Sequence, residues 1–472
     1  MHLFYGLTRR ASSVLVQGIC TILVLGSPDQ PTAWDRISVD LKTLFKRYRL
    51  DPVTHSHICC PRCFALYDPS SSPRVCTFQE FKDSAPCNTP LFKTRTIRSK
   101  THTAATRLYL HQDLKEWVGR LLSRADLEEL LDKPLPVKVT KYMEDIWHGS
   151  VLSKEFTDPG GSRFVTETNG PLRLVFGLAV DGFNSYRNLQ AKKKTSSTGI
   201  YMVCYNIPAD IRYLPENMYL AGVIPGKPSL DQINHALALL VKDLTPFWSP
   251  GVYYTQTATR CQGRHVNAAL IPLISDVLAA RQVAGFSSSS HTLFCMFCLL
   301  TSNEIENLEP SSWHPRTWEF HIKGVEAWRN ARNSTEREAA FERYGARWSA
   351  LLDLPYWKPL EYTVIDSMHN HYLGLLHNHL RSVWGMNIEA EDGDGTSNPT
   401  KKRPPVPAPK VMQSAIAILA SKDKERLLKL KHHVLWHLCA TRDLRRAKNK
   451  KMMVQELLGW VCFVKDSHAM QL

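Results

Sequence analysis

The segment at 172–181, LRLVFGLAVD, constrains the fold more than any other part of the chain. Seven of the nine residues before Asp181 are apolar, which predicts a strand buried on both faces. The strand ends in an aspartate followed by a glycine. An ionised carboxylate at the edge of a core is costly unless it is paired, hydrogen-bonded or bound to a metal. A simple strand-to-turn Asp-Gly is the alternative for this stretch taken alone.

The elements expected after this strand suggest a known fold class. They are strands at 199–207 and 218–224, a helix at 229–244 and a strand at 267–275. Three strands, a helix and a strand is the order that opens the ribonuclease H fold, so we expect an α/β (α+β) protein with a ribonuclease H-like core. Pro272 counts against a central position for the last strand, because proline cannot donate to a strand ladder.

In the ribonuclease H fold the first and fourth strands are neighbours, which would bring Asp181 together with Asp276. Two carboxylates that close repel each other unless a divalent cation lies between them. A pair of Mg²⁺ or Mn²⁺ ions held by such acids activates water or a 3′-hydroxyl against a phosphodiester. A third acid, Asp366, ends the apolar segment at 361–366, and we expect it to complete the catalytic set.

The segment after Asp366 predicts a helix at 367–384 whose leucines and tryptophan recur at helical spacing and should face the core. His369 lies one turn after Asp366 and is a candidate metal ligand. The alternative for His369 is an ordinary histidine on a helix surface.

Twelve cysteines include two C-x-x-C pairs, a pattern that favours metal binding in a reducing compartment over a disulfide framework. The first pair predicts a structural Zn²⁺ site with ligands Cys60, Cys63, Cys76 and Cys87. Cys59 could replace one ligand, and buried reduced thiols are the alternative.

The second pair, Cys295 and Cys298, has no other pair of cysteines nearby. Its partners would be histidines. A single histidine of the 367–384 helix, His369, with one from the preceding segment, His314 or His321, is the economical solution.

Net charge indicates the kind of partner. The 472 residues contain 59 Lys and Arg against 44 Asp and Glu, a formal charge of +15, which favours nucleic acid or an anionic membrane surface. The apolar segment at 12–27 is too short to span a bilayer. An N-terminal core helix explains it better than a signal peptide, so we expect no membrane partner. No nucleotide-binding glycine loop or Ser-His-Asp arrangement points to a small-molecule substrate.

The C-terminal part begins with an exposed linker at 389–411, in which the basic run 401–403 could serve as a nuclear-import signal. Two amphipathic helices then flank a basic turn and loosely resemble a SAP-type DNA-binding module. The DNA-binding residues expected there are Arg442, Arg445, Arg446, Lys448, Lys450 and Lys451.

These observations predict six regions. They are an N-terminal helical segment at 1–50, a zinc-ribbon-like region at 51–100, a helical connector at 101–165, the catalytic core at 166–388 with a helical insertion at 286–360, the linker at 389–411 and a small helical module at 412–472.

As a set, the motifs LVFGLAVDGFN, LIPLISDVLAARQVAGFSSSSHTLFCMFC and VIDSMHNHYLGLL resemble the core of the CACTA (En/Spm-like) transposases, especially the fungal ones. CCPRCFALYDP and YGARWSALLDLPYW match the same family. The resemblance implies a nuclear enzyme that uses divalent metal to cut double-stranded DNA at transposon ends and join the freed 3′-hydroxyl to a target.

The resemblance also implies roles for single residues. Asp181 and Asp276 match the first two catalytic acids of the family, and Asp366 with His369 match its D-x-x-H element. The third catalytic acid of the family is a glutamate further along, in an FER segment, so the resemblance differs from the pattern-based choice of Asp366. Glu342 stands in such a tripeptide but precedes the D-x-x-H element, and we interpret it as a surface helix residue.

No later acid in the chain as given stands in a suitable context to be that glutamate. We therefore expect binding to DNA without complete transposition. The alternative is a non-catalytic, zinc-containing DNA-binding protein derived from a transposase. Homo-oligomerisation on DNA is left open.

Overall fold

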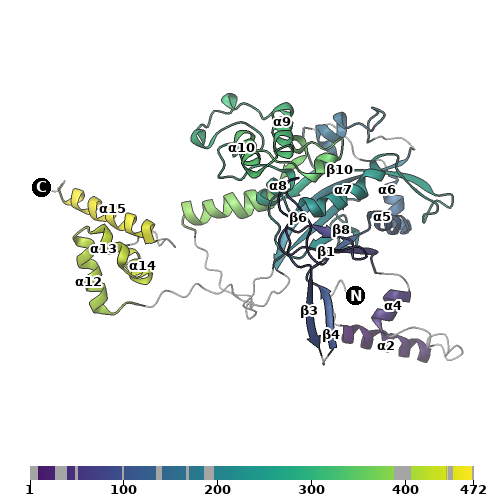
Figure 1. The fold of residues 1–472 in the computed structure, drawn as a ribbon, viewed down its shortest axis with the longest axis horizontal. Helices are drawn as coiled ribbons and strands as arrows, with labels where there is room; N and C mark the ends of the chain where they lie inside the picture. Colours follow the sequence, from purple (N-terminus) through teal and green to yellow (C-terminus); the bar gives the residue numbers. More distant parts are fainter. Residues whose placement is uncertain are drawn as a thin grey trace. The chain divides into compact units, whose positions relative to one another are not determined.

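The computed structural model describes residues 9–26, 40–47, 51–97, 100–133, 135, 141–165, 170–184, 196–386, 406–442, 444 and 450–469. It divides into two compact units, Met1–Gly385 and Met386–Leu472 (Figure 1). Within the described ranges, no helix has both the length and the apolar character needed to cross a membrane. Most of the predicted linker at 389–411, including the basic run 401–403, lies outside the described residues.

The first unit is a mixed α/β structure built around one large sheet. At its centre, β6 (Leu172–Asn184), β7 (Ser196–Cys204) and β8 (Met218–Ile224) form an antiparallel meander. β10 (Arg264–Ser275) lies parallel to β6 on its other side, and β11 (Thr363–Ile365) lies parallel to β10. The strands predicted around 172–181 and 267–275 are therefore neighbours, as the sequence predicts.

Pro272 does lie in a central strand, since β10 is placed between β11 and β6. The expectation that this proline disfavours a central position is therefore wrong. The pairing of β10 with β6 shifts register between Leu270, opposite Phe176, and Leu273, opposite Leu178. Two residues of β10, Ile271 and Pro272, thus lie opposite one residue of β6, Gly177, which is a β-bulge. A bulge leaves a residue outside the ladder, so a proline that cannot donate a hydrogen bond is tolerated there.

The sheet is wider than the sequence predicts. β5 (Leu108–Gln112) pairs with β8, and β1 (Thr54–Cys59) and β2 (Leu66–Tyr67) continue beyond it, while β9 (Val252–Tyr254) pairs with β10. The segment expected as a helical connector thus contains strands as well as helices. Its helices are α5 (Leu114–Leu122), α6 (Ala125–Leu131), η1 (Ile146–His148) and η2 (Val151–Glu155).

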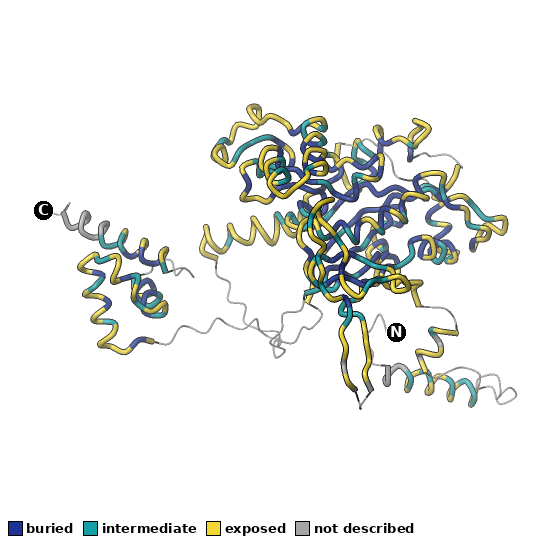
Figure 2. Tube along the Cα trace, viewed as in Figure 1, coloured by how far each residue is buried: buried dark blue, intermediate teal, exposed yellow. Residues whose placement is uncertain are grey.

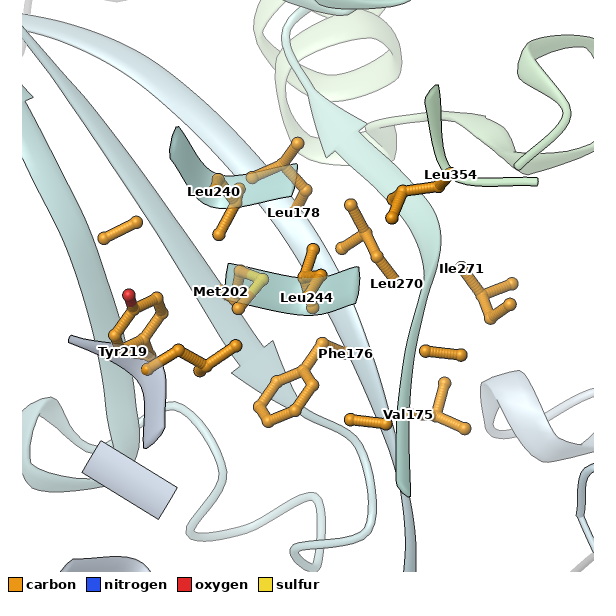
Figure 3. Close-up of a cluster of buried hydrophobic side chains, with 14 of the residues drawn as sticks. Val175, Phe176, Leu178, Met202, Tyr219, Leu240, Leu244, Leu270, Ile271 and Leu354 are labelled. Atoms are coloured by element: carbon orange, nitrogen blue, oxygen red, sulfur yellow. The ribbon is translucent and has the colours of Figure 1, made fainter. Parts of the chain in front are cut away.

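Both faces of the central strands are covered by apolar side chains (Figures 2 and 3). α7 (Asn234–Trp248) packs on one face through Leu240 and Leu244, which lie beside Phe176 and Met202. The helix begins later than the predicted residue 229, because residues 230–233 form a turn. The apolar run of β6 is therefore explained by burial on two sides.

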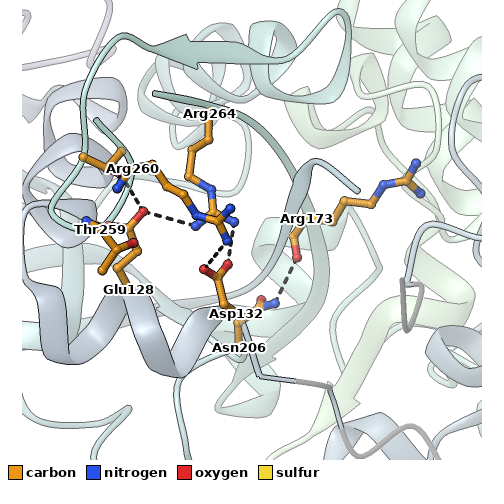
Figure 4. Close-up of polar contacts among 8 residues, drawn as sticks. Glu128, Asp132, Arg173, Asn206, Thr259, Arg260 and Arg264 are labelled. Atoms are coloured by element: carbon orange, nitrogen blue, oxygen red, sulfur yellow. Dashed lines mark hydrogen bonds and ion pairs between the residues drawn. The ribbon is translucent and has the colours of Figure 1, made fainter. Parts of the chain in front are cut away.

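A polar network joins α6 to the beginning of β10 (Figure 4). The Glu128 carboxylate is fully buried and accepts hydrogen bonds from Thr257 Oγ1 at 2.6 Å, from Thr259 N at 2.8 Å and from Arg264 at 3.1 Å. Arg264 also donates to Asp132 at 2.5 Å. The first residue of β10 is thereby fixed to a helix that precedes the meander in the sequence.

The insertion between α8 (Val277–Ala284) and β11 is helical, as expected. It contains η4 (Ser302–Glu304), η5 (Pro310–Ser312), α9 (Trp318–Arg329), α10 (Ser334–Tyr344), η6 (Ala350–Asp353) and α11 (Pro359–Tyr362). Val325, Tyr344 and Ala346 form a small core of its own. A bridge between Phe286 and Ala346 closes most of the insertion close to α8.

The helix expected at 367–384 is formed by η7 (Met368–Leu376) and η8 (His379–Val383). The prediction that its apolar residues face the core is wrong, because Leu373 is 56% exposed and Trp384 is 62% exposed. Periodicity shows which residues share a helix face, but it does not show whether another element covers that face.

The N-terminal segment contains α2 (Arg9–Gly26) and α4 (Leu41–Arg47). α2 is not a core helix, since Val14, Ile22 and Leu25 are each more than 60% exposed. Here too, the periodicity of the apolar residues does not show whether another element covers the face that they share.

The second unit is a bundle of α12 (Pro409–Ala420), α13 (Lys424–Lys429), α14 (His432–Ala440) and α15 (Lys450–Ala469). Its core contains Leu427, Leu435, Leu438, Met453 and Leu457. α14 ends at Ala440 and α15 begins at Lys450, so Lys450 and Lys451, which the sequence predicts in a basic turn, lie in α15 instead.

Candidate active site and cysteine cluster

Three aspartates lie at the same level on three neighbouring parallel strands. Ser275 of β10 pairs with Ile365 of β11, and the Ser275 hydroxyl accepts a hydrogen bond from Val180 N of β6 at 2.9 Å. The residue after each of these three positions is an aspartate: Asp181 lies within β6, whereas Asp276 and Asp366 directly follow the last residues of β10 and β11. Because neighbouring strands are about 4.8 Å apart, the three Cα atoms span roughly 10 Å.

Each aspartate has its own local support. Asp276 is the N-cap of α8, and its carboxylate accepts a hydrogen bond from Ala279 N at 2.8 Å. Asp181 is exposed and lies inside β6, which continues to Asn184 and pairs with β7 along the whole way. The sequence pattern predicts that the strand ends at Asp181. The hairpin instead extends past it, so Asp181 stands on a paired strand rather than on a turn.

Asp366 and His369 form a hydrogen-bonded pair, with 2.6 Å between Oδ2 and Nδ1. Burial acts to raise the pKa of Asp366, but hydrogen bonds from His369 and from Met368 N outweigh it, so this pKa lies below its ordinary value. The hydrogen bond to Asp366 raises the pKa of His369. The pair therefore holds a negative carboxylate and orients it.

Electrostatic coupling joins the three aspartates into one patch. The negative charges of Asp276 and Asp181 add to the raised pKa of His369. Burial raises the pKa of the Tyr201 hydroxyl, and the charges of Asp181 and Asp366 raise it further. The sequence pattern did not predict Tyr201 as a residue of this patch. It pairs with Ala179, two residues before Asp181, so the two-residue period of β7 would have placed it on the same face as the acids.

The donor chemistry of this patch fits Mg²⁺ or Mn²⁺, which prefer carboxylate oxygens. The spacing is wider than in a closed site. Among the residues that the structure describes, the aspartates and His369 do not form a group whose ligand atoms all lie within 4.8 Å of one another.

Four cysteines do form such a group. The ligand atoms of Cys60, Cys63, Cys76 and Cys87 all lie within 4.8 Å of one another. Cys60 Sγ is 3.8 Å from Cys87 Sγ, and Cys63 Sγ is 3.4 Å from Cys76 Sγ. With Zn–S bonds of about 2.3 Å, the sulfurs of a tetrahedral site lie about 3.8 Å apart. The cluster could therefore hold a metal such as zinc.

One tight loop and one longer loop bring these cysteines together. In the first, Cys60 O accepts a hydrogen bond from Phe64 N at 3.1 Å, and Cys60 Sγ accepts one from Arg62 N at 3.4 Å. In the second, the backbone of Cys76 exchanges hydrogen bonds with Thr89 and Asn88. The loops therefore gather the four sulfurs into one cluster.

Cys59 is not a member of the cluster. Successive residues of a strand point to opposite faces, and Cys59 lies in the main core while Cys60 lies in the small core around the cluster. Burial raises the pKa of the Cys59 thiol to about 12. Cys59 is thus the buried reduced thiol that the sequence left open.

The second pair of cysteines forms a similar tight turn. Cys295 Sγ accepts hydrogen bonds from Phe297 N and Cys298 N, each at 3.4 Å, and Cys298 bridges to Pro315. Within the described part of the chain, this pair and His369 are not a group with all ligand atoms within 4.8 Å.

Part of the chain matches a known protein family. Residues 162–317 match the transposase family tnp2. The matched segment includes β6 to β10 and therefore Asp181 and Asp276, and it also includes the Cys295 and Cys298 turn. Asp366, His369 and the four-cysteine cluster lie outside it. No curated protein matches the chain.

The residues expected to bind DNA in the second unit are only partly described. Arg445, Arg446 and Lys448 lie outside the described residues. Arg442 donates to Leu438 O and stacks on the Trp460 ring at 4.9 Å, and Lys450 donates to Leu428 O at 3.2 Å. These two side chains therefore also hold the bundle together.

Proposed function

We propose that this protein is a transposase of the CACTA (En/Spm-like) type, of the fungal kind, which acts in the nucleus. Its ribonuclease H-like core would cut DNA strands at transposon ends. The observation that carries the proposal is the row of aspartates at one level of β6, β10 and β11. The family match at 162–317, which contains the first two of them, supports it independently.

The order of the strands supports the ribonuclease H-like assignment. β8, β7, β6, β10 and β11 are consecutive neighbours, and only the last three run parallel. α7 connects the meander to β10, and α8 follows β10. This is the arrangement that the sequence order predicts for the fold, with the helical insertion before the last strand.

The proposed division of labour follows from the geometry. Asp181, Asp276 and Asp366 would hold Mg²⁺ or Mn²⁺, which when bound would activate the attacking oxygen and stabilise charge on the phosphate. His369 fixes the Asp366 carboxylate through its 2.6 Å hydrogen bond. The N-cap bond to Ala279 N fixes Asp276 in the same way. The cysteine cluster would hold structural Zn²⁺, and the Cys295 turn with His369 remains a second proposed zinc site.

A non-catalytic DNA-binding protein is the second candidate. It is favoured by one observation, the four-cysteine cluster, which could hold a structural metal and needs no catalytic ion. A strand-cleavage assay separates the two candidates, because both predict DNA binding but only the first predicts metal-dependent cleavage.

The experiment uses the full chain, supercoiled plasmid, and Mg²⁺ or Mn²⁺. We expect nicking that Asp181→Asn and Asp276→Asn abolish, while His369→Ala lowers it by about 10- to 100-fold, as for other residues that orient a metal ligand. Asp210→Asn, an exposed aspartate outside the patch, is the matched control. Nicking that persists in Asp181→Asn and Asp276→Asn would refute the proposal, and binding without any nicking would favour the second candidate.

A further inference from the structure

A two-stranded ribbon stands apart from the main sheet. β3 (Phe92–Ile97) pairs with β4 (Lys100–Ala105) along its whole length, and neither strand pairs with any other described strand. In Figure 1 the ribbon projects away from the main sheet, and in Figure 2 most of its described residues are exposed. We call these two strands the arm.

The arm belongs to a stretch of the sequence without acidic residues. No Asp or Glu occurs between Asp83 and Asp113. The same stretch contains Lys93, Arg95, Arg98, Lys100 and Arg107. A local run of positive charge with no compensating acid is the electrostatic signature of a polyanion-binding surface.

The register divides the arm into two chemically different faces. Residues directly opposite each other in an antiparallel pair lie on the same face. Lys93 lies opposite Ala104, Arg95 opposite His102 and Ile97 opposite Lys100, so every basic position of the strands falls on one face. The other face carries four threonines, Thr94, Thr96, Thr101 and Thr103.

The base of the arm is held firmly. Leu91 is fully buried in the small core that also contains Cys60 and Cys76, and Phe92 and Ala105 pack against this core. Leu91 N donates to Arg74 O at 3.0 Å, and Thr106 N donates to Leu91 O at 2.8 Å. Beyond Phe92 and Ala105, the arm residues Lys93, Thr94, Thr96 and 101–104 are exposed, so this described part of its surface is accessible to a partner.

We propose that the arm docks in the major groove of duplex DNA. A two-stranded ribbon fits the major groove of B-DNA, whereas the major groove of an RNA duplex is too deep and narrow to be entered. The basic face would contact phosphates, and the threonine hydroxyls can donate to and accept from phosphates or base edges. The inference takes DNA as the partner from the proposed function and adds a binding surface far in sequence from the basic turn of the second unit.

Neutralising the arm tests this. The double variant Lys93→Gln, Lys100→Gln in the full chain is compared with Lys154→Gln, Lys323→Gln, which removes the same charge from two exposed positions elsewhere. Binding to a mixed-sequence DNA duplex is measured at several salt concentrations without added Mg²⁺ or Mn²⁺. Two lost phosphate contacts should flatten the slope of log affinity against log salt by about 1.8, and weaken binding by roughly 8-fold per contact at 0.1 M salt.

The control double variant should retain the slope of the unmodified protein. Equal losses in both double variants, or no loss in the arm variant, would overturn the proposal. If the arm variant shows no loss, the role of the two lysines would instead be to prevent the exposed strand edges from pairing with other chains. A loss confined to duplex RNA or to single strands would also overturn it. Because the assay needs no cleavage, the arm can fail while the aspartate variants still abolish nicking, and the reverse.

Discussion

Replacing Glu128 by alanine should destabilise the first unit strongly, because the carboxylate is fully buried among three donors. Its removal leaves Thr257 Oγ1 and Thr259 N without their acceptor and removes one of the two carboxylates that bind Arg264. A buried donor left unpaired costs about 1–3 kcal/mol, and breaking a buried ion pair costs about 3–5 kcal/mol. Arg264 keeps Asp132, so we expect a loss of roughly 3–5 kcal/mol in all.

The same chain supplies a matched control. Glu129, the next residue of α6, is exposed, so Glu129→Ala should change stability by no more than about 0.5 kcal/mol. Hydrogen exchange of the α6 and β10 amides, which reports local opening free energies, measures both variants. Equal protection in Glu128→Ala and Glu129→Ala would contradict the assignment of Glu128 as the fixing residue.

The contribution of Glu128 should depend on pH. Burial acts to raise the pKa of Glu128, but the hydrogen bonds from Thr257, Thr259 and Arg264 outweigh it, and the pKa lies below its ordinary value. A carboxyl whose pKa is depressed in the folded state stabilises that state above its unfolded pKa, about 4.3, and loses this contribution as pH falls through the folded pKa. The difference between wild type and Glu128→Ala should therefore shrink below about pH 4.3. A difference that stays constant down to pH 3 would refute the charge-based reasoning.

Three further predictions concern packing, metal and DNA. Gly177→Ala should destabilise the sheet by about 1–3 kcal/mol in denaturant unfolding, because a Cβ there would lie 2.4 Å from the Tyr205 ring, whereas Gly182→Ala, with open space around it, should be nearly neutral. A fragment covering 51–100 should contain zinc under reducing conditions, and chelation should loosen it; metal analysis that finds none would refute the site. The segment at 424–464 should bind duplex DNA weakly, and charge reversal at Arg445 and Arg446 should weaken this for all sequences; a segment that binds nothing even at low salt would contradict the SAP-like interpretation.

Sequence patterns predicted the parts of the fold that depend on local burial. The apolar run before Asp181 and the one before Asp276 were recognised as strands because each is buried on both faces. Their adjacency followed from the order of elements. The spacing of the cysteines was enough to predict the cluster, since all four lie within the one local segment from Cys60 to Cys87.

The remaining features depend on partners that are distant in sequence. β5 joins the sheet by pairing with β8. The five residues of β5 do not indicate which strand it pairs with. Pro272 was misjudged because a bulge is a property of two strands together. The apolar residues of the helix after Asp366 have the spacing of a core helix, yet side chains such as Leu373 and Trp384 are exposed.

The bridge between Phe286 and Ala346 has a consequence for how such a chain can change. Most of the residues that separate Asp276 from Asp366 lie inside the loop that this bridge closes, and the Ser349 hydroxyl donates to Val283 O beside it. The entropy lost on closing a loop grows only with the logarithm of its length, about 0.6 kcal/mol for each doubling. Segments can therefore be gained or lost between Phe286 and Ala346 at little energetic cost, while the spacing of the aspartates is set by strand pairing alone.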